Sequence, residues 1–477
     1  MTSMAFNMDY TALLPEIVLL AAAVLGLLGG SFLPRNRQIL TRWFSLGALA
    51  LSAAAGVRGL NGSGPMPEVI FSATYALDIP TAVVRVAAPL ATFVVILIGR
   101  QEFIGSSRES ETYALLLLAT LGTVVIGGTT DLLVLVAGYL LASIPLYALI
   151  GLSRTGPAAE ATLKTYLIGA LFGVLLMAGV TVLTGLAGSS SYAGMREALS
   201  TAPVAAVAGG AVAVLIGLTF KAGSVPGHFW IPDASQASGI AVAAFLTTVP
   251  KIGALIALGR LVEVLPGTVN ISLLVALLAV AGMTVGNLAA LTQTNVRRLL
   301  GWSTVSQVGY LLMPLAVLNT SDNAQGALLA YIVLYALTNL ALFAVAACFP
   351  GRENLGDWAG VARAHPWITG ALIVSALSLV GTPPTAVFIG KVIIFTVTWD
   401  GGMAWLVVAA AANSVLSLFY YLRLFRPTFR SPPPGTLPTD DETPEAPWTV
   451  KAVGVALGAA VLAGAPLVAG LWLAATT

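Results

Sequence analysis

The chain has 477 residues, of which 58% are hydrophobic and only 9% are charged, and its mean hydropathy is +0.93. Soluble domains carry roughly 25% charged residues, so this composition excludes an ordinary soluble protein. A net charge of +2 gives no reason to expect nucleic acid as a partner. With one cysteine, Cys348, and two histidines, the sequence also excludes a disulfide framework, a cysteine-ligated iron–sulfur site and a histidine-rich metal site.

Apolar stretches of about 17–25 residues recur along the chain, separated by short polar segments. They predict an all-α polytopic membrane protein with about fourteen transmembrane helices. We place these helices near 11–33, 40–60, 79–99, 112–129, 131–152, 163–187, 204–223, 240–264, 271–291, 297–318, 324–349, 367–398, 402–426 and 449–474.

The basic residues support this order of helices, because cytoplasmic loops carry an excess of lysine and arginine. When the loops are numbered along the chain, the odd-numbered loops hold most of the 22 basic residues. The even-numbered loops hold only Arg58, Arg196 and Arg260. We therefore expect the odd-numbered loops in the cytoplasm and both termini on the outer face of the membrane.

Lysine is rare in this chain, and its placement is the sharpest signal. Only five of the 22 basic residues are lysine, and Lys221, Lys251 and Lys391 all lie within apolar stretches. A charge at the bilayer centre costs ~2.5–3.5 kcal/mol or more. Because lysine, unlike arginine, can lose its proton when it is buried, a row of buried lysines suits a proton relay. The alternative is that these lysines snorkel from helix ends.

Two of the lysines lie beside predicted helix breaks. Lys221 precedes Pro226, and Lys391 follows Pro383 and Pro384. Inside a membrane such breaks are tolerated where the freed backbone groups are buried in protein or meet water. The breaks fall in the seventh and twelfth predicted helices, which predicts two inverted five-helix repeats, spans 4–8 and 9–13, around an ion pathway. Ordinary proline kinks are the alternative.

This pattern divides the chain into five predicted parts. They are an N-terminal three-helix segment (1–110), a first repeat (111–265), a second repeat (266–430), a proline-rich acidic cytoplasmic loop (431–448) and a C-terminal transmembrane helix (449–477).

The two histidines differ in context. His228 follows the first break in VPGHFWIPD, where it could shuttle protons or be a buried structural residue. His365, in ARAHPW, lies at a junction between a loop and a helix, where a structural or solvated role is expected.

Three arginines also stand out. Arg85 lies within the third predicted helix and needs a partner; Asp78 is close in sequence but near the membrane surface. Arg297 and Arg298 open a predicted helix, where we expect them to meet lipid headgroups.

Several motifs resemble those of the antiporter-like membrane subunits of respiratory complex I, and the resemblance covers nearly the whole chain. They are FKAGSVPGHFWIPDA, AAFLTTVPKIGAL, QTNVRRLLGWSTVSQVGYLL and LSLVGTPPTAVFIGKVIIF. The resemblance implies a membrane-arm subunit of a bacterial NADH-quinone oxidoreductase that couples electron transfer in other subunits to proton translocation. It implies that NADH, FMN, iron–sulfur clusters and quinone are bound by partner subunits and that this chain binds no cofactor.

The same motifs imply which residues carry protons. Lys221, Lys251 and Lys391 match the lysines of the seventh, eighth and twelfth helices of that family. Lys164, in ATLKTYLIGAL, matches a lysine at the start of the sixth helix, and His228 matches the histidine of the broken-helix motif.

The sequence departs from the family pattern at two places. Leu140 stands where the fifth helix of the family carries a glutamate that pairs with the lysine matched by Lys221, and Gln307 stands where the tenth helix carries a histidine. Glutamine cannot titrate. Two alternatives therefore remain beside the pumping subunit: a subunit of a multisubunit cation/proton antiporter, and a structural paralogue that does not pump.

Overall fold

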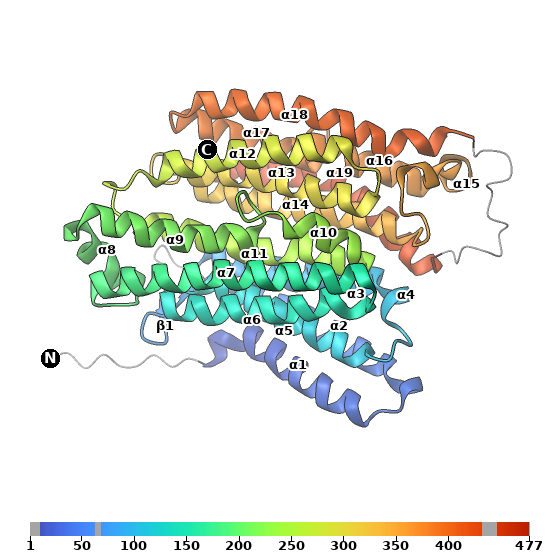
Figure 1. Ribbon diagram of the computed structural model, residues 1–477, viewed down its shortest axis with the longest axis horizontal. Coiled ribbons are helices and arrows are strands. Elements are labelled where there is room, and N and C mark those ends of the chain that lie inside the picture. The colour runs from blue at the N-terminus through green and yellow to red at the C-terminus, as the bar shows by residue number, and fades with distance from the viewer. Residues whose placement is uncertain (1–9, 63–67, 432–445, 477) are drawn as a thin grey trace.

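The computed structural model describes residues 10–62, 68–431 and 446–476. These form a bundle of long helices whose axes are roughly aligned (Figure 1). In this part of the chain, 12 helices are long and apolar enough to cross a membrane. A small hairpin, β1 (Glu68–Ile70) and β2 (Tyr75–Leu77), pairs antiparallel at one end of the bundle.

The elements follow one another in three groups. The N-terminal group contains α1 (Leu14–Phe32), α2 (Ile39–Gly62), α3 (Ile79–Ile98) and α4 (Arg100–Phe103). The next contains α5 (Glu109–Gly128), α6 (Leu132–Ile150), α7 (Gly156–Ala187), α8 (Tyr192–Thr201), α9 (Val204–Ala222), α10 (Trp230–Ala237) and α11 (Ile240–Val264). The last contains α12 (Ile271–Thr292), α13 (Val296–Ala316), α14 (Ala324–Ala347), α15 (Val361–Ala364), α16 (Pro366–Val380), α17 (Ala386–Asp400), α18 (Ala404–Phe425) and α19 (Trp448–Thr476).

Short 3-10 turns lie between or beside these helices. They are η1 (Tyr10–Leu13), η2 (Arg35–Arg37), η3 (Gly151–Ser153), η4 (Leu355–Trp358) and η5 (Arg426–Phe429).

These helices confirm the predicted all-α polytopic fold. The 12 candidate spans correspond to predicted helices, and the other two predictions fall on α13 and on the pair α16 and α17. Helix α13 is almost wholly buried and carries many polar residues, which explains why it is less apolar than the rest. The sequence did not predict α8 or the β-hairpin, because both are short and lie in polar connections.

Both predicted breaks are present. Helix α9 ends at Ala222, and the chain runs irregularly until α10 begins at Trp230. Helix α16 ends at Val380, and α17 begins at Ala386. Each first half ends on a glycine with left-handed backbone, Gly223 with φ +84° and Gly381 with φ +92°, a conformation that favours glycine.

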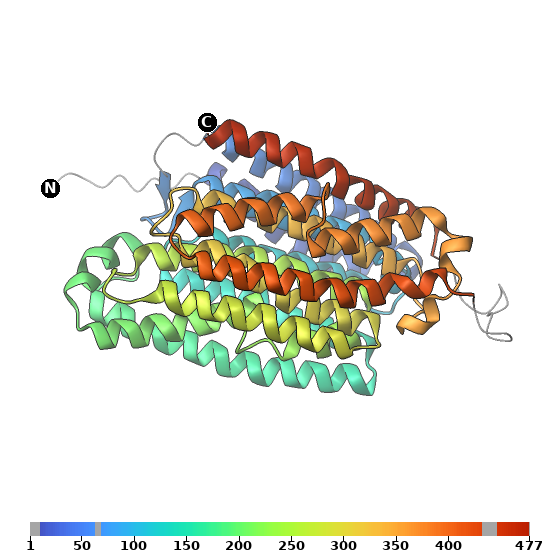
Figure 2. The same ribbon diagram turned by 90° about the horizontal axis from the view of Figure 1, so that it is seen from above.

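Helix α11 forms the centre of the bundle. The most apolar part of α11 is entirely buried, and the helix contacts α3, α5, α9 and α14. Helices α1, α7, α18 and α19 lie at the periphery, where most of their apolar surface is exposed. The start of α1 and the end of α19 lie at the same end of the bundle (Figures 1 and 2), as the predicted even number of crossings requires. Most of the predicted proline-rich loop, 431–448, lies outside the described residues.

Candidate functional site

Lys221 is buried in the last turn of α9, where it meets α6. Its Nζ donates a 2.9 Å hydrogen bond to Oγ of Ser143 and lies 5.7 Å from the centre of the Tyr139 ring. Leu140 itself is 41% exposed. The side chains that face Lys221 from α6 are therefore Ser143 and Tyr139, and in the described part of the chain no carboxylate forms an ion pair with this lysine.

Lys251 lies in the middle of the buried helix α11, beside the first break. A Cβ placed on Gly223 would collide with Cδ1 of Ile231 and would stand 3.1 Å from Nζ of Lys251, so both side chains fill space that the glycine leaves. Among the described residues, no group lies within hydrogen-bond distance of Nζ. Burial of an unpaired polar or charged group costs free energy, so Lys251 stands out as a buried lysine that no described side chain or carbonyl holds in place.

Lys391 is buried in α17, just after the second break. Its Nζ donates to the carbonyl oxygens of Val380 (2.9 Å) and Leu379 (3.3 Å), at the end of α16. It also donates to Oγ of Ser414 (3.0 Å) and lies 4.0 Å from the centre of the Tyr310 ring. Every one of these contacts is neutral, so the proton on Lys391 has acceptors but no fixed countercharge.

Polar side chains fill the space between Lys251 and Lys391. On α11, the hydroxyls of Thr247 and Thr248 accept hydrogen bonds from Nδ2 of Asn339 (3.0 and 2.8 Å). The Tyr335 hydroxyl donates to the carbonyl oxygen of Thr247 (2.8 Å) and to Oγ1 of Thr304 (3.3 Å). Thus α14 bridges α11, which carries Lys251, to α13.

Gln307 completes this polar series toward Lys391. It accepts a hydrogen bond from the Tyr331 hydroxyl (2.8 Å), and its Nε2 donates to the carbonyl oxygen of Leu379 (2.9 Å), which also accepts from Lys391. These residues of α14 were not predicted from the sequence. The signal that could have identified Asn339 is a polar residue inside the apolar stretch YALTNL.

Lys164 does not join the buried row. Its side chain is 48% exposed and forms ion pairs with Glu160 (2.6 Å) and Asp233 (3.4 Å). These residues line a cleft of about 860 Å³ at the end of the bundle where α7 begins.

Arg297 and Arg298 also line this cleft, which corrects the expectation that they meet lipid headgroups. Arg298 pairs with Asp233 (2.6 Å), and Arg297 pairs with Glu353 (2.8 Å). The acidic partners lie far away in sequence, so the pairing could not be read from the local pattern.

The two histidines are both packed against aromatic rings. His228 is buried in the first break, with ring centres 4.1 Å from Phe229 and 5.5 Å from Trp302, and its Nδ1 has no hydrogen-bond partner among the described residues. His365 packs 5.3 Å from Phe349 at the start of α16.

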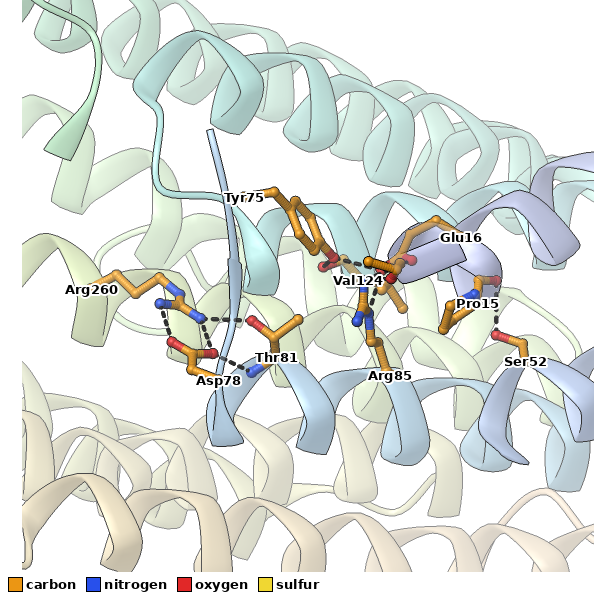
Figure 3. Close-up of polar contacts among 10 residues, drawn as sticks. Pro15, Glu16, Ser52, Tyr75, Asp78, Thr81, Arg85, Val124 and Arg260 are labelled. Carbon is orange, nitrogen blue, oxygen red and sulfur yellow. Dashed lines mark hydrogen bonds and ion pairs between the residues drawn. The ribbon is translucent and has the colours of Figure 1, made fainter. Parts of the chain in front are cut away.

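Arg85 finds its partner in α1, not in the nearby Asp78 (Figure 3). Its guanidinium binds both oxygens of Glu16 (2.7 and 3.0 Å), and the Tyr75 hydroxyl donates to the same carboxylate (2.6 Å). Burial, together with the Glu16 carboxylate, raises the pKa of Tyr75 well above its usual value. Glu16 was not predicted as this partner from the sequence.

Asp78 instead pairs with Arg260 in the C-terminal half of α11 (Figure 3). The two Arg260 amino groups donate to the two carboxylate oxygens at 2.8 and 2.7 Å. Burial alone would raise the pKa of Asp78, but the hydrogen bonds and charge of Arg260 outweigh burial and hold that pKa below its usual value. This pair joins the N-terminal helices to α11.

Comparison with known proteins shows the family to which the chain is similar. Residues 129–417 match the family described as NADH:quinone oxidoreductase/Mrp antiporter, TM. NADH-quinone oxidoreductase subunit N of Mycobacterium sp. (strain JLS) is 51% identical over 420 residues, 87% of this chain and 88% of that protein. NADH-quinone oxidoreductase subunit N 1 of Streptomyces griseus is 46% identical over 465 residues, 96% of each chain.

Solved structures agree. A chain of respiratory complex I from Thermus thermophilus superposes with a TM-score of 0.80 at 31% identity, covering 94% of this chain and 96% of that one. A chain of the Mrp complex from Dietzia sp. has a TM-score of 0.83 at 22% identity, covering 98% of this chain and 96% of that one, which shows a shared fold alone.

The fold and the lysine row thus define a polytopic membrane subunit of the class that complex I shares with Mrp antiporters. Within that class, the chain belongs to the NADH-quinone oxidoreductase subunit N family. The identity to subunit N (51%) is much higher than that to the Mrp chain (22%). This difference favours the predicted complex I subunit over the cation-antiporter alternative.

Proposed function

We propose that this chain is a membrane-arm subunit of a bacterial NADH-quinone oxidoreductase and that it carries protons through Lys221, Lys251 and Lys391. Electron transfer would take place in partner subunits, which would bind NADH, FMN, iron–sulfur clusters and quinone. The chain would lie in the cell membrane with both termini on the outer face, packed against other membrane subunits.

One observation carries the proposal: three buried lysines have no carboxylate partner among the described residues, and a series of polar groups leads from α11, which carries Lys251, to Lys391. Lys251 has no hydrogen-bond partner there, and Lys391 rests on backbone carbonyls and a hydroxyl. Neutral contacts hold a lysine in place without fixing its proton, because only an opposite charge strongly favours the ammonium form. Such a series suits a relay better than a scaffold.

The cleft supplies an entry side for this relay. Lys164 and Asp233 line it, and His228 lies five residues before Asp233 on the loop that leads back to Gly223. We propose that protons enter between these groups, with Lys164 as the outermost member and His228 as the link to the break beside Lys251.

The test is proton translocation by the assembled complex reconstituted into vesicles. We expect Lys391→Ala to lower the number of protons moved per electron while NADH oxidation by the other subunits continues. Lys451→Ala, which removes a lysine from the start of α19, is the control and should leave the ratio unchanged. If Lys391→Ala leaves proton translocation unchanged, the pumping proposal fails.

A structural subunit that pumps weakly is the second candidate, and the contact between Lys221 and Ser143 favours it. A serine hydroxyl cannot supply the countercharge that a glutamate would. Because Leu140 is 41% exposed while Ser143 bonds Lys221, we expect Ser143→Asp to change translocation more than Leu140→Glu does. Equal effects of the two variants would show that Leu140 turns toward Lys221 in the assembled complex.

A further inference from the structure

A buried amide joins three helices of the second repeat. Asn287 on α12 is fully buried, and its Nδ2 donates to the backbone oxygen (2.8 Å) and to Oδ1 (3.1 Å) of Asn413 on α18. Its Oδ1 accepts from Ser306 on α13 (2.7 Å) and from the Tyr420 hydroxyl on α18 (3.3 Å). An asparagine side chain has two donor hydrogens and two acceptor lone pairs, so this amide is completely used.

Asn413, which the Asn287 amide binds, lies next to a residue of the Lys391 site. Asn413 immediately precedes Ser414, whose Oγ lies 3.0 Å from Nζ of Lys391 and 3.0 Å from the Tyr310 hydroxyl. That hydroxyl also donates to the backbone oxygen of Ala410 (3.2 Å), one turn earlier on α18. The segment of α18 that faces Lys391 is therefore held at one end by Asn287.

Helix α18 needs such a tie. It is a peripheral helix that packs mainly on α12 and α16, and only about one third of its apolar stretch is buried. A rotation of α18 about its axis would carry Ser414 away from Lys391. The hydrogen bonds from Asn287 to Asn413 oppose that rotation because the backbone oxygen takes part in them.

We propose that Asn287 is a positioning residue of the Lys391 site: it fixes the rotation of α18 so that Ser414 stays against the Lys391 ammonium. This inference rests on the proposed function. A neutral amide is suited to the role, because a carboxylate at the same place would add a fixed charge near a lysine that must release its proton.

The test uses a double-mutant cycle in the reconstituted complex. Asn287→Leu and Ser414→Ala should each lower the rate of proton translocation about 2- to 10-fold, the range expected from the loss of one hydrogen bond. Because Asn287 acts through Ser414, the double variant should be no worse than Ser414→Ala alone. Multiplying effects would overturn the inference, since they would show that Asn287 acts elsewhere.

Two further variants keep the test decisive. Val285→Ala is the control. It changes an exposed residue two positions before Asn287 on α12 and should leave the rate of proton translocation unchanged. If Asn287→Leu prevents assembly, Asn413→Ala is the substitute. It removes the side-chain half of the contact with Asn287, together with the hydrogen bond from Nδ2 of Asn413 to Oγ1 of Thr284 (3.3 Å) on the same helix α12, and should give a smaller fall that Ser414→Ala again hides. If Lys391→Ala has no effect, the proposed function fails; if Lys391→Ala acts but the cycle is multiplicative, only the role of Asn287 fails.

Discussion

Lys391 donates a 2.9 Å hydrogen bond to the carbonyl oxygen of Val380, the last residue of helix α16. The carbonyl groups in the last turn of a helix have no partners within the helix and carry a partial negative charge. A break within the membrane therefore provides a place where an ammonium group is bound without a carboxylate. The chain ends α16 at that point because Gly381 adopts a left-handed conformation.

The first break shares one part of this arrangement, a buried lysine beside the glycine that ends the helix. Lys251 comes from α11, yet its Nζ lies against Gly223, which ends α9 in the same left-handed conformation. Each broken helix thus ends on a glycine that a buried lysine contacts. Glycine has two roles there, because it adopts the positive φ and because it leaves space for the lysine.

We predict that Gly381→Ala will impair proton translocation. The left-handed conformation costs a residue with a Cβ roughly 1–2 kcal/mol. The added Cβ would also stand 2.8 Å from Cδ of Lys391, so the lysine must move from its carbonyl partners. The protons moved per electron and the thermal unfolding temperature of the complex should both fall.

The control for this variant is Gly370→Ala on the same helix. A Cβ at Gly370 meets nothing within 4 Å, and an alanine favours a helix, so neither quantity should fall. Equal losses in the two variants would show that the effect comes from α16 as a whole and not from the contact with Lys391.

We predict that Lys251→Leu will abolish translocation without lowering stability. Nζ of Lys251 has no hydrogen-bond partner among the described residues, and burial of an unpaired polar or charged group is unfavourable. Replacement of such a group by an apolar one of similar size is neutral or stabilising, by about 1–4 kcal/mol in buried ion pairs. The measurement is thermal unfolding of the purified complex beside its proton translocation.

Lys251→Arg is the comparison, because it keeps the charge and adds bulk in the space beside Gly223. It should lower the unfolding temperature, while Lys251→Leu should not. A lower unfolding temperature for Lys251→Leu would indicate that a buried partner binds the ammonium in the assembled complex.

The order of the helices and both breaks could be predicted from the sequence, because each depends on local signals. Runs of apolar residues mark the helices, and Pro226 and Pro383 mark the breaks. Helix α13 was also placed correctly, although its polar residues make it less apolar than the rest, because its neighbours fix where it must lie.

Partners across the bundle could not be predicted, because they depend on the packing of distant helices. Arg85 pairs with Glu16, 69 residues earlier, and not with Asp78, its neighbour in sequence. Arg298 pairs with Asp233 and not with lipid. The lysines were recognised as buried, but their contacts, such as Ser143 and Ser414, came only from the structure.

We predict that Glu16→Leu will strongly destabilise the N-terminal helices. It leaves the Arg85 guanidinium buried without its countercharge, and loss of one member of a buried pair costs about 3–5 kcal/mol. The Tyr75 hydroxyl also loses an acceptor. Limited proteolysis and thermal unfolding of the purified complex measure this loss.

The double variant Glu16→Leu/Arg85→Met separates the pair from its surroundings. It removes both charges, so its unfolding temperature should lie above that of Glu16→Leu alone, and the two losses should not add. Additive losses would contradict the idea that the two residues stabilise the fold as a pair.

Glu102 gives the fold a dependence on pH near neutrality. It lies in α4, outside the spanning helices, and its carboxylate accepts hydrogen bonds from the backbone N–H of Ala241 (both 3.2 Å) at the start of α11. Burial raises the pKa of Glu102 to about 7, although the N–H groups of Ala241 and Ile240 and the charge of Arg297 oppose the rise. The carboxyl group therefore takes up a proton on folding between its unfolded pKa of about 4.5 and about 7.

Because the pKa of Glu102 is raised on folding, we predict that its contribution to stability falls as the pH rises from about 4.5 to about 7. A group whose pKa is raised on folding favours the folded state at low pH, and this advantage is lost as the pH passes the folded value of about 7. Glu102→Gln cannot ionise, so it should flatten the fall in unfolding temperature between about pH 4.5 and pH 7 and raise stability above pH 7. Glu111→Gln, on the nearby start of α5, is the control. An unchanged slope for Glu102→Gln, with the same slope in the control, would show that the Glu102 carboxyl already ionises at its ordinary pH in the assembled complex.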